Sequence, residues 1–279
     1  MKKYFCISDI HSYYNEMIDA LNKAGFDKDN ENNILIVCGD LFDRGTQTLE
    51  VYNFIKSIPV DRRILIKGNH ESLMLELLCK SIPSSFDYSN GTVSSCCQIA
   101  GIDEKYMDIK YTRKFNDDAF DRIHAVWGNI KDKVKQHEIY SWLQSDEWLN
   151  YYELDKYIFV HSFISVQENW RSIKDLRDPN WEDARWGCPW INFKDGLFND
   201  EIKKGKVLVC GHWHASDFHT QFEGKDYNDF TIYYGKNLIA LDACTAYSKF
   251  CNVMVLEKES ENKLSDNCYD TNGNILVIK

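Results

Sequence analysis

The sequence predicts an α/β fold whose sheet has a parallel section, and two observations carry this prediction. Short β-branched or aromatic runs of strand length recur along the chain, and helical patterns separate the first three of them. These three runs begin about 30 residues apart, which is the length that a right-handed crossover through one helix requires. The chain of 279 residues, 44% of them hydrophobic, is long enough to bury a large core.

The predicted strands are short apolar runs spread along the whole chain. They are Tyr4 to Ile7, Ile34 to Cys38, Ile64 to Ile66, Tyr157 to Val160, Val207 to Cys210, Leu238 to Leu241, Val253 to Leu256 and Ile275 to Ile278. Apolar residues at helical spacing predict helices that contain Met17 to Leu21, Leu49 to Ile55 and Leu73 to Leu78. The N-terminal part is therefore expected to run β-α-β-α-β-α.

From about Ser84 to Asn150 the strand pattern gives way to a charged, aromatic stretch. Aromatic residues are too frequent there for a disordered linker, and Trp142 and Leu143 lie at helical spacing. We predict a helical insertion or cap within a single domain that spans residues 1–279. A Pro- and Trp-rich piece from Asp178 to Trp190 is predicted to be a loop, and loops above strand ends often carry function.

Composition and charge argue against several classes of protein. The chain has 33 basic and 43 acidic residues and a net charge of −10, so general binding to duplex nucleic acid is not expected. The longest purely apolar run, Ile34 to Cys38, is far shorter than the roughly 18 residues of a membrane-spanning helix. Cys6, Cys38 and Cys210 lie inside predicted strands and no Cys-x-x-Cys pair occurs, which indicates reduced thiols and a cytoplasmic protein.

Residues that can bind metal gather at the C-terminal ends of the predicted strands. Five of the eight histidines lie there, namely His11, His70, His161, His212 and His214. Other polar residues lie beside them, namely Asp9, Asp40, Asp43 and Asn69. Because α/β sheets bind ligands at strand C-termini, we expect these side chains at one edge of one sheet.

These residue types favour a centre with two divalent metal ions. Carboxylate, amide and imidazole donors suit Mn, Fe, Zn or Mg. Two ions about 3.5 to 4 Å apart need a bridging carboxylate, and Asp40 is the expected bridge. Such a pair clamps a phosphoryl group and lowers the pKa of a bound water to about 7. A lone Asp-x-His is more often a surface feature, but buried acids packed together would repel one another without a cation.

As a set, the motifs resemble those of the calcineurin-like metallophosphoesterases, and within them the phosphoprotein phosphatase branch. The matching segments are Asp9-x-His11, Gly39 to Gly45, Gly68 to Glu71, His161 and His212. The resemblance covers most of the chain and implies a four-layer sandwich of two mixed sheets flanked by helices. It also implies that Asp9, His11 and Asp40 hold a first metal, and that Asp40, Asn69, His161 and His212 hold a second.

The same resemblance makes His70 the general acid that protonates the leaving oxygen, oriented by Asp43, with Arg44 on the phosphate oxygens. A carboxylate on the far ring nitrogen fixes the tautomer of a histidine and raises its basicity, and arginine gives bidentate contact to phosphate. A second family arginine lies between the last two histidine motifs. We assign it to Arg185, with Arg177 in reserve.

Two features depart from the phosphoprotein phosphatase branch. Ser8 and Ser12 stand where that branch has glycine, and His212-Trp213-His214 stands where it has a single late histidine. The second feature resembles the wider class, in which the latter histidine binds the first metal, so His214 is a further candidate ligand. Gly211-His212-Trp213 also resembles the symmetrical dinucleoside tetraphosphatases, whose second motif typically lacks the acid found here at Asp43.

We therefore expect a metal-dependent enzyme, with manganese the first choice of metal, that hydrolyses phosphomonoesters by direct attack of metal-activated hydroxide. The leading substrate is a phosphoprotein or small phosphoester, in the manner of a Ser/Thr protein phosphatase. Alternatives are symmetrical cleavage of dinucleoside tetraphosphates, phosphodiester or RNA-end processing, and a non-catalytic module that uses the metal site as a scaffold. The complete set of His70, Asp43 and Arg44 counts against the last of these.

Overall fold

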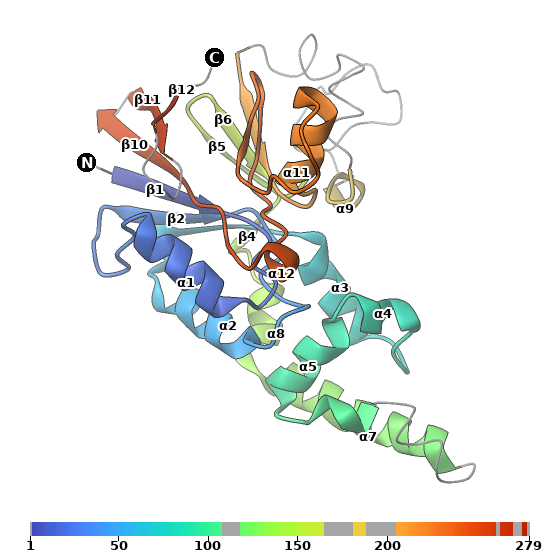
Figure 1. Ribbon diagram of the computed structural model, residues 1–279. Coiled ribbons are helices and arrows are strands. Elements are labelled where there is room, and N and C mark those ends of the chain that lie inside the picture. Colours follow the sequence, from blue (N-terminus) through green and yellow to red (C-terminus); the bar gives the residue numbers. More distant parts are fainter. Residues whose placement is uncertain are drawn as a thin grey trace.

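The computed structural model describes residues 2–107, 118–164, 181–187, 205–260, 263–269 and 275–277. Two β-sheets pack face to face, and helices cover their outer sides (Figure 1). The four-layer α/β arrangement of two sheets flanked by helices is therefore confirmed.

The larger sheet has seven strands and mixes parallel with antiparallel pairs. Its order is β12 (Ile275–Val277), β11 (Lys263–Tyr269), β10 (Met254–Ser260), β1 (Lys2–Ile7), β2 (Asn33–Val37), β3 (Arg63–Ile66) and β4 (Trp148–Leu149). Strands β1 to β4 run parallel, as the crossover spacing predicts, whereas β10, β11 and β12 are antiparallel to their neighbours.

The smaller sheet has five strands, in the order β5 (Tyr151–Leu154), β6 (Tyr157–Val160), β7 (Val207–Cys210), β9 (Leu238–Ala240) and β8 (Tyr233–Tyr234). Strands β6, β7 and β9 are parallel, and β5 and β8 are antiparallel edge strands. The sequence pattern did not predict β4, β5, β8 or β11, which are either very short or rich in polar residues.

Alternation along the strands explains how the four layers form. Phe5 and Ile7 of β1 pack against the helices on the outer side, whereas Tyr4 and Cys6 pack between the two sheets. Phe159 of β6 belongs to this inter-sheet core, and its neighbour Ile158 packs against the outer helices of the smaller sheet. The central strands are buried on both faces, so they show as continuous apolar runs in the sequence.

The predicted first three helices are present as α1 (Tyr14–Lys23), α2 (Thr48–Ser57) and α3 (Asn69–Leu77), with the short turn η1 (Val60–Arg62) after α2. On the outer side of the smaller sheet lie α9 (Trp181–Ala184), α11 (Ala215–Phe218) and the π turn η4 (His219–Glu223). The short helix α12 (Thr245–Ser248) follows β9. Helix α9 falls inside the piece predicted as a loop, so that prediction was wrong for Trp181–Ala184. One helical turn is too short to give a periodic signal.

Between α3 and β4 the chain forms a helical stretch that extends away from the sheets (Figure 1). It consists of α4 (Ser85–Ser89), α5 (Thr92–Ala100), η2 (Glu104–Met107), α7 (Asp118–Gln136) and α8 (Glu138–Leu143). The predicted insertion, 84–150, runs too far, because Trp148 and Leu149 form β4 and pair with β3. Two residues give no readable alternation.

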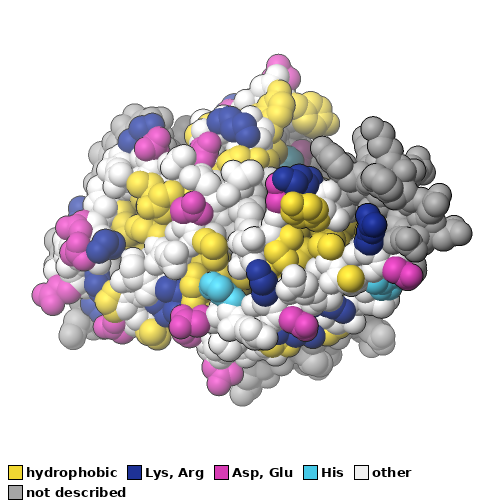
Figure 2. Space-filling model, turned by 90° about the horizontal axis from the view of Figure 1, so that it is seen from below, with side chains coloured by type: hydrophobic (Ala, Val, Ile, Leu, Met, Phe, Trp, Pro, Cys, Tyr) yellow, Lys and Arg dark blue, Asp and Glu magenta, His cyan; other side chains and the backbone are white. Residues whose placement is uncertain are grey.

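On the described part of the face in Figure 2, acidic, basic and hydrophobic side chains are interspersed, with no broad basic patch. Among the described residues, no helix is long and apolar enough to cross a membrane.

Candidate metal centre

The predicted site residues come from both sheets rather than from one. Asp9, Asp40 and Asn69 follow β1, β2 and β3 of the larger sheet, whereas His161 and His212 follow β6 and β7 of the smaller one. The expectation that all of them lie at one edge of one sheet was therefore wrong. A strand-end pattern shows that a residue lies at a carboxyl edge, but it does not show which sheet the strand joins.

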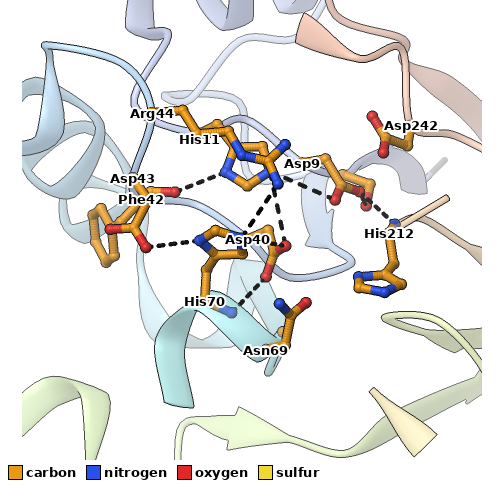
Figure 3. Close-up of polar contacts among 12 residues, drawn as sticks. Asp9, His11, Asp40, Phe42, Asp43, Arg44, Asn69, His70, His212 and Asp242 are labelled. Carbon is orange, nitrogen blue, oxygen red and sulfur yellow. Dashed lines mark hydrogen bonds and ion pairs between the residues drawn. The ribbon is translucent and has the colours of Figure 1, made fainter. Parts of the chain in front are cut away.

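A first group of donors surrounds one oxygen of Asp40. His11 Nε2 lies 3.8 Å and His70 Nε2 3.9 Å from Asp40 Oδ2, and the three residues offer ligand atoms within 4.8 Å of one another. Asp9 Oδ1 lies 3.9 Å from His11 Nε2. Figure 3 shows these side chains directed toward one another. Atoms bound to one ion at about 2.1 Å cannot lie more than about 4.2 Å apart, so modest closure of this group would suit a cation.

A second group converges on the ring of His161. Its Nε2 lies 2.8 Å from Asn69 Oδ1, 3.2 Å from His212 Nδ1 and 3.4 Å from Asp40 Oδ2. Asp40 thus belongs to both groups, as a bridging carboxylate must.

Backbone carbonyl groups fix the histidine tautomers that a metal requires. His161 Nδ1 donates to the carbonyl of Cys38 over 2.8 Å, and His11 Nδ1 donates to the carbonyl of Phe42 over 2.9 Å. In both rings Nε2 is left with its lone pair toward Asp40. Several lone pairs therefore meet around His161 Nε2, an arrangement that a cation stabilises and an apolar core does not.

The electrostatics also fit a cation. Burial, together with Asp242 and Asp40, raises the pKa of Asp9 well above its usual value. Burial lowers the pKa of His11 and of His161, so both rings are neutral at pH 7. Buried carboxylates that repel one another beside neutral imidazoles form a donor set that divalent ions such as Mn, Fe or Zn complete.

The strand ends bend through unusual backbone conformations to bring these donors together. Asp9, Asp40 and His212 have φ angles of 54°, 55° and 67°. Gly68 and Gly211 have no room for a β-carbon, which would collide with Asp40 Oδ1 and with Ser8 Oγ respectively. Positive φ in residues other than glycine costs roughly 1 to 3 kcal/mol each, so the turns are held by their surroundings.

Beside the first group lies the predicted acid. His70 Nδ1 is 2.7 Å from Asp43 Oδ2, and both side chains are almost fully buried. Burial alone would lower the pKa of His70, but Asp40 and the hydrogen bond to Asp43 outweigh it and raise that pKa. Arg44 Nη2 lies 3.4 Å from His70 Nε2 (Figure 3), and Arg44 is exposed to solvent.

Glu71 ties two of the strand ends together. Its carboxylate accepts hydrogen bonds from the backbone nitrogens of Asp40 (3.0 Å), Leu41 (2.9 Å) and Gly68 (2.8 Å). Burial and Asp40 raise the pKa of Glu71 to about 7, against the effect of these hydrogen bonds. Glu71 therefore fixes the backbone that carries Asp40, the carboxylate shared by the two donor groups.

Arg185, the predicted second phosphate-binding arginine, is held by contacts within the protein. Arg185 binds the carbonyl of Lys67 over 3.2 Å and Asn150 Oδ1 over 2.7 Å, and it forms an ion pair with Glu182. These contacts occupy its guanidinium with the protein itself. Its alternative, Arg177, lies outside the described residues.

His214 lies outside both donor groups. A hydrogen bond with the Cys244 side chain and the charge of Asp242 raise its pKa to about 9, against the effect of burial. A protonated ring does not bind a metal, so ligation by His214 would require loss of that proton.

The sequence analysis overlooked Asp242. This residue follows β9 and is 3% exposed, and its carboxylate accepts a hydrogen bond from the Cys244 backbone nitrogen over 2.7 Å. It raises the pKa of Asp9, and Figure 3 shows it beside that residue. The strand-end rule that identified Asp9 applies equally to Asp242, because an acid follows the predicted strand Leu238 to Leu241 directly.

Curated relatives share part of the chain. A symmetrical bis(5'-nucleosyl)-tetraphosphatase of Buchnera aphidicola subsp. Baizongia pistaciae is 38% identical over 77 residues, which is 28% of this chain and 26% of that protein. The enzyme of the same name from Psychromonas ingrahamii is 25% identical over 242 residues, covering 76% of this chain and 82% of that protein. The first relatives are thus matched over only about a quarter of their length.

Solved structures and a family model extend the comparison to most of the chain. A cold-active protein tyrosine phosphatase has a TM-score of 0.58 and 15% identity, covering 100% of this chain and 79% of that chain. The enzyme from a Shewanella species gives 0.54 and 18%, covering 100% and 81%. At such identity the likeness concerns the fold alone. The model of the calcineurin-like phosphoesterases matches residues 2–241, so this chain belongs to the calcineurin-like phosphoesterase family.

Proposed function

We propose that this protein is a metal-dependent hydrolase of phosphomonoesters, with a phosphoprotein or small phosphoester as substrate and two divalent ions, manganese first among them, as cofactors. The observation that carries the proposal is the position of His70. It contacts Asp40, which belongs to both donor groups, and its other ring nitrogen is bound to Asp43. The site therefore offers donors for two ions and a proton donor side by side.

Asp9, His11 and Asp40 would hold one ion, and Asp40, Asn69, His161 and His212 the other. Divalent ions held there would lower the pKa of a water molecule to about 7 and stabilise charge on the phosphoryl group. Arg44, exposed beside His70, would bind the remaining phosphate oxygens through its planar guanidinium. His70 would give its proton to the leaving oxygen, and Asp43 would keep the ring oriented.

The pair of His70 and Asp43 supports monoesters over anhydrides. Alkoxide leaving groups, such as those of phosphoserine or phosphothreonine, need a proton from a positioned acid. The leaving group of a polyphosphate is already a stable anion, so its departure depends less on a proton from such an acid.

A second candidate is hydrolysis of dinucleoside polyphosphates, and Trp186 favours it. This side chain is 48% exposed and stands edge-on to His212, with ring centroids 5.6 Å apart. The backbone beside it is fixed, because the carbonyl of Gly187 accepts a hydrogen bond from the indole of Trp213 over 2.8 Å. An exposed indole beside the site can stack on a base, worth roughly 1 to 3 kcal/mol. The curated relatives carry tetraphosphatase names.

The test is kcat/KM for a serine phosphopeptide and for diadenosine tetraphosphate, with manganese and then with manganese removed by chelation. Monoester hydrolysis predicts higher kcat/KM for the phosphopeptide and no turnover without metal. A preference for the dinucleotide of more than about tenfold, or roughly 1.4 kcal/mol, would favour the second candidate. Full turnover in protein that elemental analysis shows to be free of metal would refute both.

We also propose a cytoplasmic enzyme. Among the eight cysteines whose side chains the structure describes, no disulfide forms, and six of the eight are buried, namely Cys6, Cys38, Cys96, Cys97, Cys210 and Cys251. Free thiols are typical of a reducing compartment.

A further inference from the structure

The first turn of α5 lies directly against the segment that carries Asp43 and Arg44. Gly91 precedes this helix with a φ of 81°, and a β-carbon on it would collide with the backbone nitrogen of Arg44. Most of the helical stretch extends away from the sheets (Figure 1). Its α5 nevertheless reaches the loop after β2, where the proposed acid is assembled.

Two hydroxyl groups of α5 bind Asp43, one at the side chain and one at the backbone. Thr92 Oγ1 donates to Asp43 Oδ2 over 2.7 Å, and the backbone nitrogen of Asp43 donates to Ser95 Oγ over 2.9 Å. Thr92 is 1% exposed and Ser95 is fully buried. Water therefore cannot replace either contact easily, and one helix fixes Asp43 at two points.

Thr92 and His70 share the same carboxylate oxygen. His70 Nδ1 lies 2.7 Å from Asp43 Oδ2, whereas Asp43 Oδ1 is buried without a hydrogen-bond partner among the described residues. Rotation of the carboxylate would deprive two buried donors of their acceptor, which is unfavourable because water cannot reach them. The hydrogen bond from Thr92 therefore keeps Asp43 Oδ2 directed at His70 Nδ1.

We propose that Thr92 and Ser95 are positioning residues that hold Asp43, and through it His70, in the orientation needed for general acid catalysis. This inference rests on the proposed function, because it assigns His70 the role of acid. It places part of the catalytic apparatus in the helical stretch, outside all the strand-end motifs.

The test compares Thr92→Val and Thr92→Ser on a serine phosphopeptide, whose leaving group needs an acid, and on an aryl phosphate, whose leaving group hardly does. We expect Thr92→Val to lower kcat for the phosphopeptide about tenfold and for the aryl phosphate less than about threefold, with manganese content retained. Thr92→Ser keeps the hydroxyl and should restore kcat. Ser94→Ala, on the same helix, is the matched control, because the Ser94 hydroxyl accepts a hydrogen bond from Gln98 Nε2 rather than binding Asp43.

A spectroscopic readout keeps the proposal testable apart from turnover. The proton on His70 Nδ1 should give a strongly deshielded NMR resonance that His70→Asn removes, and Thr92→Val should shift it while Ser94→Ala leaves it in place. If Thr92→Val does not fold, Ser95→Ala takes its place in the same measurements, with the same expected split between substrates.

Three results would overturn the proposal. Equal loss on both substrates in Thr92→Val would mean that Thr92 supports the fold or the metals rather than the acid. An unchanged kcat for the phosphopeptide would mean that Asp43 needs no support. If His70→Asn itself loses both substrates equally, the acid role of the proposed function fails, and Thr92 has no acid to position.

Discussion

The loops that follow β1, β2, β3, β6 and β7 form what we call the strand-end region. This region and the helical stretch differ in backbone strain and in the kind of residue that they bury. At the strand ends, residues other than glycine adopt positive φ, including Asp9 and Asp40, and carboxylates are buried close together. In the described part of 85–143, every residue with positive φ is a glycine, and Val93, Trp127 and Ile130 form a fully buried apolar core. One region concentrates strain and charge, and the other supplies packing.

From this difference we infer that the packed core of the rest of the molecule stabilises the candidate site. Strained backbone and repelling charges persist only where the surrounding structure holds them. Variants at the strand ends should therefore change metal binding and turnover more than folding, and variants in the helical core should do the reverse. Helix α5 connects the two regions through Thr92 and Ser95, which bind Asp43.

The largest effect is expected from Asp40→Asn. Loss of the shared carboxylate should abolish manganese binding and all measurable turnover, because both donor groups contain it. The asparagine retains an oxygen for the backbone nitrogen of His70, now 3.0 Å from Asp40 Oδ1, so the unfolding free energy of the metal-free protein should change by less than about 1 kcal/mol. Added manganese should stabilise the wild type but not the variant.

Calorimetry and denaturant unfolding, each with and without manganese, measure these quantities. Asp155→Asn, at an exposed turn, is the matched control. A metal-free variant that is several kcal/mol less stable than the wild type would remove the contrast between the two regions.

His70→Asn comes next. Its kcat for a serine phosphopeptide should fall about 10² to 10⁴-fold, because the leaving alkoxide loses its proton donor. An activated aryl phosphate should lose less, and manganese content should be retained. If the variant loses manganese together with activity, His70 is a metal ligand rather than the acid. This alternative is tested because His70 belongs to the first donor group.

Trp127→Ala tests the other region. Trp127 of α7 is fully buried, and its indole donates to the carbonyl of Lys80 over 3.2 Å. Removal should lower the unfolding free energy by about 3 to 5 kcal/mol. At a temperature where the variant is folded, its kcat and manganese affinity should stay within about twofold of wild type. If Trp127→Ala does not fold, Trp127→Phe gives the same comparison with a smaller loss of unfolding free energy. A large loss of manganese affinity in either variant would show that the two regions are not independent.

The sequence could predict the elements that are buried on both faces. Strands β1, β2, β6 and β7 show as apolar runs because packing between two layers leaves no polar face. Strand β11 carries Lys263, Asp266 and Asn267, and β4 has two residues, so neither gives a readable pattern. The spacing of the first three strands predicted a parallel section, but nothing in the sequence pattern indicated that the strands divide into two sheets.

For the site, the sequence could predict which residues stand at strand ends but not what holds them. Glu71 and Thr92 act on Asp40 and Asp43 through helices that begin after the strands, and such contacts depend on how those helices dock. Arg185 was chosen from its place in the sequence, yet its contacts are with Lys67 and Asn150. Spacing along the chain carries no information on such long-range contacts.

The smallest effect is expected from Glu71→Gln, which tests how the strand-end region is held. The carboxylate of Glu71 accepts from the backbone nitrogens of Asp40 and Gly68 through the same oxygen, and from Leu41 through the other. Glutamine offers one accepting oxygen, and its amide group would face a backbone donor, so the turn that presents Asp40 should loosen. Manganese affinity should fall about 10 to 100-fold, as for other residues that orient metal ligands.

Glu76→Gln is the matched control, because Glu76 lies on the same helix, α3, and is exposed to solvent. Isothermal titration with manganese measures both variants against the wild type. An affinity in Glu71→Gln equal to that in Glu76→Gln would mean that the turn keeps its shape without the carboxylate. The strand ends would then be held by the packing beneath them alone, and the helix starts would have no share in presenting Asp40.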